Sequence, residues 1–263
     1  MASMLHLINP LYSVSGFVVG ALVGLTGVGG GSLMTPLLVL LFGIHPGTAV
    51  GTDLLYAGLT KICGSAVHGF NRAIDWRVTR RLASGSVPAA AVTLSALAHL
   101  GVNSKGSTTA ITTALGFALI LTAVALVFRR RLLTALASHI EARTEREIST
   151  LTIVLGAILG VLVSISSVGA GALGVTALLI LYPKMQTVRI VGSDIAHAVP
   201  LTLIAGAGHW WLGSVDWPLL VSLLPGSIPG IVIGGHFASR APEQILRPLL
   251  AGILAVVGGR LVF

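Results

Sequence analysis

Charged residues and cysteine are scarce in this sequence. Only 9% of its 263 residues are Asp, Glu, Lys or Arg, whereas a soluble domain carries roughly 25%, so the chain lacks the polar surface that faces water. The single cysteine, Cys63, lies in an apolar segment, which excludes a disulfide framework and a cysteine-based metal site. The sequence also lacks an HExxH motif and a Walker A motif. We therefore expect no metal cofactor and no ATP hydrolysis by a P-loop.

Apolar residues are abundant instead, at 54% of the chain with a mean hydropathy of +0.96. A membrane-spanning helix needs about 20 apolar residues. Apolar stretches occupy almost the whole chain, at 12–43, 47–70, 82–102, 108–128, 149–182, 190–213, 217–238 and 244–263. The isoelectric point near 10.8 would suit nucleic acid, but the basic residues lie in short loops, as in cytoplasmic loops of membrane proteins. We predict an all-α, multi-pass integral membrane protein that binds no nucleic acid.

The two halves of the chain match after a shift of about 140 residues. All four aspartates fall into two matched pairs, with Asp53 corresponding to Asp194 and Asp75 to Asp216. Such a repeat in a membrane chain indicates a transporter with two related halves around a central site; the alternative is an old duplication that now serves only packing. The predicted organisation is a first repeat at 1–128, a basic cytoplasmic linker at 129–148 and a second repeat at 149–263.

The topology depends on the Gly-rich centres of the runs 12–43 and 149–182. As single crossings, these runs give parallel repeats with ten Lys and Arg residues on the cytoplasmic side and five outside. As hairpins that enter and return on one side, they give inverted repeats with thirteen inside and only Lys105 and Arg260 outside. Cytoplasmic loops are enriched in Lys and Arg, which favours the second arrangement. We therefore predict two inverted repeats, each with a broken, re-entrant Gly-rich hairpin.

Several motifs of the first half form a specific combination: Gly24–Gly31, Ala49–Asp53, Thr60-Lys61, His68, Asp75-Trp76 and Gly85–Pro88. Together they resemble the signature of the sulfite exporter TauE/SafE family, also called the TSUP family of anion transporters, over nearly the whole chain. The resemblance implies an inner-membrane protein that moves sulfite, sulfoacetate, sulfolactate or another small organosulfur or carboxylate anion. The second half departs from the pattern, with Ser164–Gly171 in place of the glycine run and Thr202 in place of Lys61. The two halves of the site are therefore not chemically equal.

The two Gly-rich breaks are the first candidate for the anion site. After the first break, Ser32 begins a helical stretch whose N-terminus would present free N–H groups and the positive end of the helix dipole. The second break offers the same from the other half. The alternative is close helix packing through small residues. The candidate binding residues of the breaks are Gly29, Gly30, Gly31, Ser32, Ser166, Ser167, Gly169 and Gly171.

Ionisable and aromatic residues inside apolar spans complete the candidate site. Lys61 is the only basic residue deep in a span, where a lysine costs about 2.5–3.5 kcal/mol, so we expect it to bind the anion, or else to snorkel or pair with a carboxylate. Tyr56 and His197 occupy matching mid-helix positions that could line a cavity, and Pro200 predicts a local helix break nearby.

The remaining polar residues allow two interpretations. Asp53 and Asp194, with Thr52 and Ser193 before them, are expected to begin their helices, and serve either as helix caps or in coupling to an ion. The Asp-Trp pairs are expected to be interfacial anchors, and His68 and His209 caps or gates.

These features favour a secondary transporter of small anions in the cell inner membrane. An anion channel and a carrier for carboxylates are the alternatives, while an intramembrane enzyme lacks a nucleophile–base or metal constellation. A negative-inside potential drives an anion outward by about 2.3 kcal/mol per charge per 100 mV, so uptake would need coupling to H⁺ or Na⁺. A homodimer is compatible with the sequence. The sequence leaves the substrate and the direction of transport open.

Overall fold

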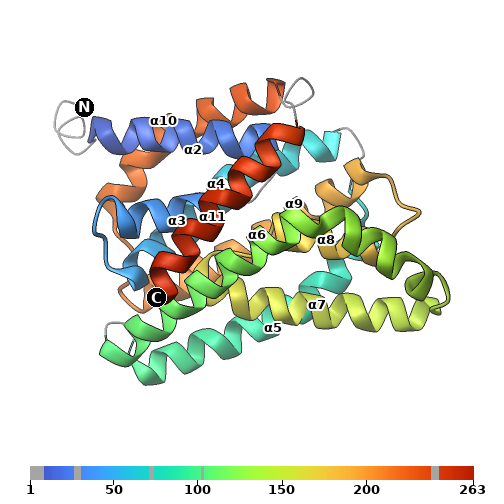
Figure 1. Ribbon diagram of the computed structural model, residues 1–263. Helices are drawn as coiled ribbons and strands as arrows, with labels where there is room; N and C mark the ends of the chain where they lie inside the picture. The colour runs from blue at the N-terminus through green and yellow to red at the C-terminus, as the bar shows by residue number, and fades with distance from the viewer. Residues whose placement is uncertain (1–8, 27–30, 71–73, 102–103, 238–242) are drawn as a thin grey trace.

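The computed structural model describes residues 9–26, 31–70, 74–101, 104–237 and 243–263, and every regular element in these ranges is an α-helix (Figure 1). The helices are α2 (Pro10–Thr26), α3 (Gly31–Leu40), α4 (Pro46–Phe70), α5 (Trp76–Leu100), α6 (Lys105–Glu141), α7 (Glu145–Ser166), α8 (Ala172–Leu181), α9 (Thr187–Trp211), α10 (Trp217–Phe237) and α11 (Glu243–Val262). Five of them, α5, α6, α7, α9 and α10, are long and apolar enough to cross a membrane. The predicted all-α integral membrane fold is confirmed.

Both long apolar runs are broken and fold back on themselves. The Tyr12 ring of α2 packs against Phe42, just after α3, with ring centroids 4.9 Å apart. In the second half, Thr152 of α7 is hydrogen-bonded to Tyr182, just after α8, at 2.8 Å. The second arms, α3 and α8, have 10 residues each, about 15 Å of helix and half the thickness of a bilayer core. The chain thus enters and leaves each hairpin at the same end of the molecule.

Positive backbone φ angles make the turn of the second hairpin. Ser167 has φ 59°, while Gly169 and Gly171 have φ 133° and 120°. Angles of this kind are accessible to glycine and costly for most side chains. The glycines that we predicted at this break are therefore needed for the turn between α7 and α8. Gly29 and Gly30 of the first break lie outside the described residues.

Each hairpin packs on a helix of the other half. In the first hairpin, Gly16 and Gly20 of α2 lie against the backbone of α10 at Leu223 and Ser227. Gly156 and Gly160 of α7, the matching positions, lie against Leu82 and Ser86 of α5. Absence of a Cβ lets these backbones approach closely. The predicted repeats 1–128 and 149–263 are thus interleaved in space, and residues 129–141 of the predicted linker continue α6 as helix.

The matched helices α4 and α9 pack against each other in opposite directions. Gly58 of α4 lies beside Leu203 of α9, whereas Gly206, further along α9, lies beside Leu55, earlier in α4. α6 and α11 are also antiparallel, since Gly116 meets Val262 while Leu126 shares a core cluster with Leu250. Antiparallel packing of matched helices is what inverted repeats require. It supports the predicted inversion, whose orientation in the membrane stays a prediction.

A reciprocal pair of hydrogen bonds also joins the halves. Thr52 Oγ1 accepts from the backbone N–H of Asp216 at 2.9 Å, and Ser193 Oγ accepts from that of Asp75 at 2.8 Å. Asp75 in turn caps α5, and Asp216 accepts from Leu219 N at 2.9 Å at the start of α10. Thr52 and Ser193 therefore fix the starts of helices in the opposite half.

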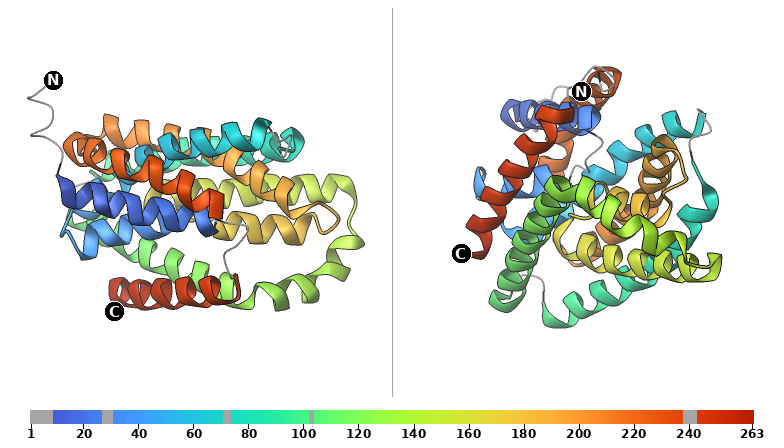
Figure 2. Two further views of the ribbon diagram at one scale, coloured as in Figure 1. Left: turned by 90° about the horizontal axis from the view of Figure 1, so that it is seen from above. Right: turned by 45° about the vertical axis from the view of Figure 1, so that its right-hand side comes forward.

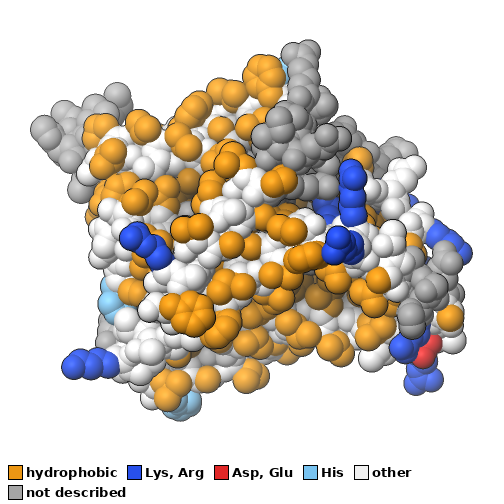
Figure 3. Space-filling model, viewed as in Figure 1, with side chains coloured by type: hydrophobic (Ala, Val, Ile, Leu, Met, Phe, Trp, Pro, Cys, Tyr) orange, Lys and Arg blue, Asp and Glu red, His pale blue; other side chains and the backbone are white. Residues whose placement is uncertain are grey.

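Polar and apolar surfaces separate along the molecule. The long helices run roughly along one direction (Figure 2), and the face in Figure 3 shows Lys and Arg toward its two sides with largely hydrophobic surface between them. At one end, Arg77 and Arg81 both pair with Glu145 at 3.1 Å, and Arg189 pairs with Asp75 at 3.1 Å. The starts of α5, α7 and α9 thus meet at this end, which is the predicted cytoplasmic end.

Candidate functional site

Three ionisable side chains lie at the buried centre of the molecule. Asp53 and Asp194, the matched aspartates, are 0% and 1% exposed, and Lys61 is 8% exposed. The Lys61 ammonium group is within electrostatic range of both carboxylates, with Asp194 the stronger partner. Lys61 nevertheless forms no hydrogen bond or ion pair with any residue that the structure describes. It lies eight residues after Asp53 in α4, which explains the absence of a direct pair within the helix.

The Asp53 carboxylate is held beside the N-terminal half of α3. Thr35, in the second turn of α3, donates its hydroxyl to Asp53 Oδ2. The Ser167 hydroxyl, from the break in the other half, faces the same carboxylate without completing a hydrogen bond, and Oδ1 has no partner. Asp53 is therefore in contact with both hairpins.

Asp194 lies at the matching position, at the start of α8. Its carboxylate faces the backbone N–H of Gly171, and its Oδ1 has no hydrogen-bond partner among the residues that the structure describes. A Cβ at Gly174 would overlap this oxygen, so the absence of a side chain there makes the space for the carboxylate. The positive end of the α8 dipole thus faces a carboxylate of the protein itself.

These positions correct the prediction that Asp53 and Asp194 begin their own helices. α4 begins at Pro46 and α9 at Thr187, so both aspartates lie about two turns inside. Proline is favoured in the first turn of a helix, because its missing N–H is not needed there. Asp194 instead lies at the N-terminal end of α8, and Asp53 lies beside Thr35 in the second turn of α3.

Tyr56 lies near Asp53 and His197 lies near Lys61, while their predicted role in lining a binding cavity stays a prediction. Ser86 Oγ and His197 Nε2 are hydrogen-bonded at 2.8 Å, and His197 also lies near Lys61. The Tyr56 and Ser227 hydroxyls face each other but are not aligned for a hydrogen bond. Both contacts join α4 or α9 to a helix of the opposite half. Pro200 does not break α9, which is helical from Thr187 to Trp211, so that prediction is wrong.

The other predicted residues have more local roles. Ser166 Oγ donates to the Leu162 carbonyl at 2.6 Å and accepts from Val168 N at 3.2 Å, which secures the end of α7. His209 Nε2 donates to the Ser164 carbonyl at 2.9 Å and so acts as a cap, while the side chain of His68 lies outside the described residues. Ser32 is buried in the first turn of α3, and Gly31 begins that helix.

Sequence reasoning missed Thr35, Ser86, Ser227 and Gly174. The repeat contained a signal for three of them, since Thr35 corresponds to Thr176 and Ser86 to Ser227 after the shift. Gly174 has no such signal, because Leu33 occupies the matching position. Only the packing of Asp194 against α8 reveals why a glycine is required.

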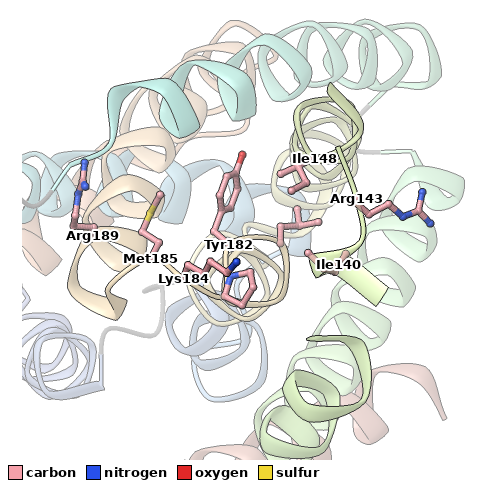
Figure 4. Close-up of a pocket in the computed structure, with 9 residues that line it drawn as sticks. Ile140, Arg143, Ile148, Tyr182, Lys184, Met185 and Arg189 are labelled. Atoms are coloured by element: carbon pink, nitrogen blue, oxygen red, sulfur yellow. The ribbon is translucent and has the colours of Figure 1, made fainter. Parts of the chain in front are cut away.

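A second polar region is an open cavity of about 470 Å³ at the basic end. Figure 4 shows Tyr182 and Lys184 in the middle of its wall, with Arg189 on one side and Arg143 on the other. The surrounding lining is apolar, including Met185. This cavity is well placed to attract anions toward the predicted cytoplasmic end of the hairpin α7–α8.

Comparisons with known proteins point to one family. A family model described as "Sulfite exporter TauE/SafE" matches residues 12–261. The probable membrane transporter protein YjnA of Bacillus subtilis is 39% identical over 251 residues, covering 94% of this chain and 97% of its own. A probable membrane transporter protein of Methanocaldococcus jannaschii is 27% identical over 270 residues, covering 96% of this chain and 94% of its own. No solved structure gives a significant match.

Proposed function

The chain belongs to the sulfite exporter TauE/SafE family of multi-pass membrane proteins, and from that premise we propose that it is a secondary transporter of sulfite or small organosulfur anions across the cell inner membrane. The observation that carries the proposal is the buried centre, where Lys61 lies within electrostatic range of Asp53, which contacts α3, and of Asp194, at the start of α8. Lys61 and the N-terminus of α8 supply the positive groups that can attract a small anion, although Asp53 and Asp194 lie beside them.

The closed centre favours a carrier over an anion channel. Lys61, Asp53 and Asp194 are all buried, and none of them lines the cavity of about 470 Å³ at the basic end. An anion must therefore wait for a rearrangement before it reaches Lys61. Such gating is typical of alternating access, in which one set of helices moves against the other around a fixed site.

Transport by purified protein in proteoliposomes tests this function. We expect uptake of sulfite or sulfoacetate to saturate with concentration and to exceed uptake of acetate and chloride. Protein-free liposomes and liposomes with the Lys61→Met variant are the controls. Ohmic anion currents without saturation would favour a channel, and preference for carboxylates would favour the alternative substrate class.

Single cysteines test the inverted topology. In a Cys63→Ala background, Ser104→Cys and Trp211→Cys should both react with an impermeant reagent added outside, because both positions are exposed at the end opposite the basic cluster. Arg146→Cys, exposed at the basic end, should react only after the membrane is opened. Labelling of Trp211→Cys only from the inside would show that the second repeat is parallel to the first.

A further inference from the structure

The buried centre has unequal numbers of positive and negative groups. Two carboxylates, Asp53 and Asp194, face one ammonium group, Lys61, so the ionised centre carries one uncompensated negative charge. The other titratable groups facing it are Tyr56, on α4 with Asp53, and His197, on α9 with Asp194. The described residues of α3, α5, α7, α8 and α10 contribute hydroxyl and backbone groups but no charged side chain there.

A second negative charge is costly in such a place. Buried charges are tolerated only where they are paired or well hydrogen-bonded. An anion at Lys61 would share the one cation with two carboxylates and face the same helix N-termini that these carboxylates occupy. Binding therefore requires neutralisation of one carboxylate, and a proton is the smallest ligand that does so.

The two carboxylates differ in their ability to stay ionised. Asp53 accepts a hydrogen bond from the Thr35 hydroxyl and faces Ser167, both of which favour the charged form. Asp194 faces the Gly171 N–H but has no hydroxyl donor among the described residues, and its counter-charge is Lys61. The Oδ1 atoms of both carboxylates lack a hydrogen-bond partner there, so the hydroxyl groups make the difference. An anion that takes over Lys61 removes that counter-charge from Asp194. Asp194 is then the carboxylate whose charged form has fewer stabilising contacts.

We propose that Asp194 binds one proton for each anion that binds at Lys61, so that the protein moves a small anion together with a proton. This inference rests on the proposed function. The proton comes from water on the loading side, joins the Asp194 carboxylate, and leaves to water on the other side when the anion dissociates. No covalent bond of the anion is formed or broken. A monoanion then crosses without net charge, and a dianion carries one negative charge per cycle.

Proton uptake on binding tests the proposal directly. Sulfoacetate and sulfite are added to purified protein in weakly buffered detergent solution, and the protons taken up are counted against the anions bound. We expect about one proton per anion, and an affinity for the sulfonate that falls about tenfold per pH unit once Asp194 is ionised in the free protein. Asp194→Asn, which mimics the protonated carboxyl, should bind sulfoacetate with little dependence on pH and without proton uptake. Asp53→Asn should retain the uptake.

Four results would overturn the proposal: binding without proton uptake, uptake that persists in Asp194→Asn, uptake that disappears in His197→Gln, and a requirement for Na⁺. If Asp194→Asn does not fold, transport by the wild-type protein in proteoliposomes tests proton coupling instead. A pH gradient must drive sulfoacetate to accumulate on the alkaline side, and absence of accumulation contradicts proton coupling. If wild-type protein binds neither sulfite nor sulfoacetate, the proposed function itself is contradicted instead.

Discussion

Asp53 and Asp194 occupy matching positions in the two halves, but their surroundings differ. Asp53 is hydrogen-bonded by the hydroxyl of Thr35. The residue that corresponds to Thr35 is Thr176, which donates to the Ala172 carbonyl of its own helix at 2.6 Å and leaves Asp194 without a hydroxyl donor. Asp194 gains space instead, because Gly174 has no side chain. The duplication thus preserves the acid and changes its partners.

The two halves also differ at the position of the buried cation. Lys61 has Thr202 as its counterpart, and the Thr202 hydroxyl is hydrogen-bonded to the Ala198 carbonyl of its own helix at 2.8 Å. One half therefore supplies the positive charge and the other supplies the less supported carboxylate. A strictly symmetric centre would place two lysines and two aspartates together, with no residual charge to be balanced by a proton. The asymmetry is therefore what allows an anion and a proton to bind as a pair.

The largest effect is expected from Lys61→Met. The substitution keeps the length of the side chain but removes a charge-assisted hydrogen bond to the anion, so affinity should fall by about 1.5–3 kcal/mol, or about one to two decades. Calorimetric titration with sulfoacetate measures this loss of affinity, and size-exclusion chromatography verifies that the variant is folded. Unchanged affinity in a folded variant would leave Lys61 with a structural role only.

Exchanging the side chains at the matched positions Lys61 and Thr202 tests whether the cation must come from the first half. The double variant Lys61→Thr, Thr202→Lys moves the ammonium group to the matching position, since Thr202 lies near Gly58 of α4 across the α4–α9 contact. Partial recovery relative to Lys61→Thr alone indicates that the site needs a central cation and not a particular half. If the double variant binds no better than Lys61→Thr alone, only the first half can hold the cation.

A smaller effect is expected from Gly174→Ala. The added Cβ overlaps Asp194 Oδ1 and forces the carboxylate to move, and overpacking of this kind costs about 1–3 kcal/mol. Gly252→Ala in α11 is the matched control, because nothing lies within 4 Å of its Cβ position, and it should change the free energy of unfolding by less than about 0.5 kcal/mol. Thermal unfolding of both variants measures the difference. Equal losses would mean that the space at Gly174 is not specific to Asp194.

Much of the architecture could be predicted from the sequence. The apolar runs gave the all-α membrane fold, because little else can bury so much apolar surface in a chain with so few charges. The glycines and serines of the second break marked the turn between α7 and α8, where three of the five residues 167–171 have positive φ angles. The repeat also predicted which residues would correspond across the halves.

Contacts between the halves could not be predicted. The helix starts at Pro46 and Thr187 depend on how α4 and α9 pack, so the sequence placed Asp53 and Asp194 at helix ends when they lie inside. The contacts of Asp53 with Thr35 of α3 and of Asp194 with Gly171 at the start of α8 depend on hairpin geometry, which no local pattern encodes. The proton requirement is a consequence of that packing.

The smallest effect is expected at the matched serines. Ser86 is hydrogen-bonded to His197 at 2.8 Å, whereas Ser227 faces Tyr56 without a hydrogen bond. Ser86→Ala leaves His197 Nε2 unsatisfied in a buried place and should lower the free energy of unfolding by about 1 kcal/mol, while Ser227→Ala should be close to neutral because no bond is lost. Chemical unfolding of the two variants side by side, in the same detergent, gives the comparison. Equal losses from both variants would show that the Ser86–His197 bond contributes nothing beyond packing, and that this difference between the halves has no energetic weight.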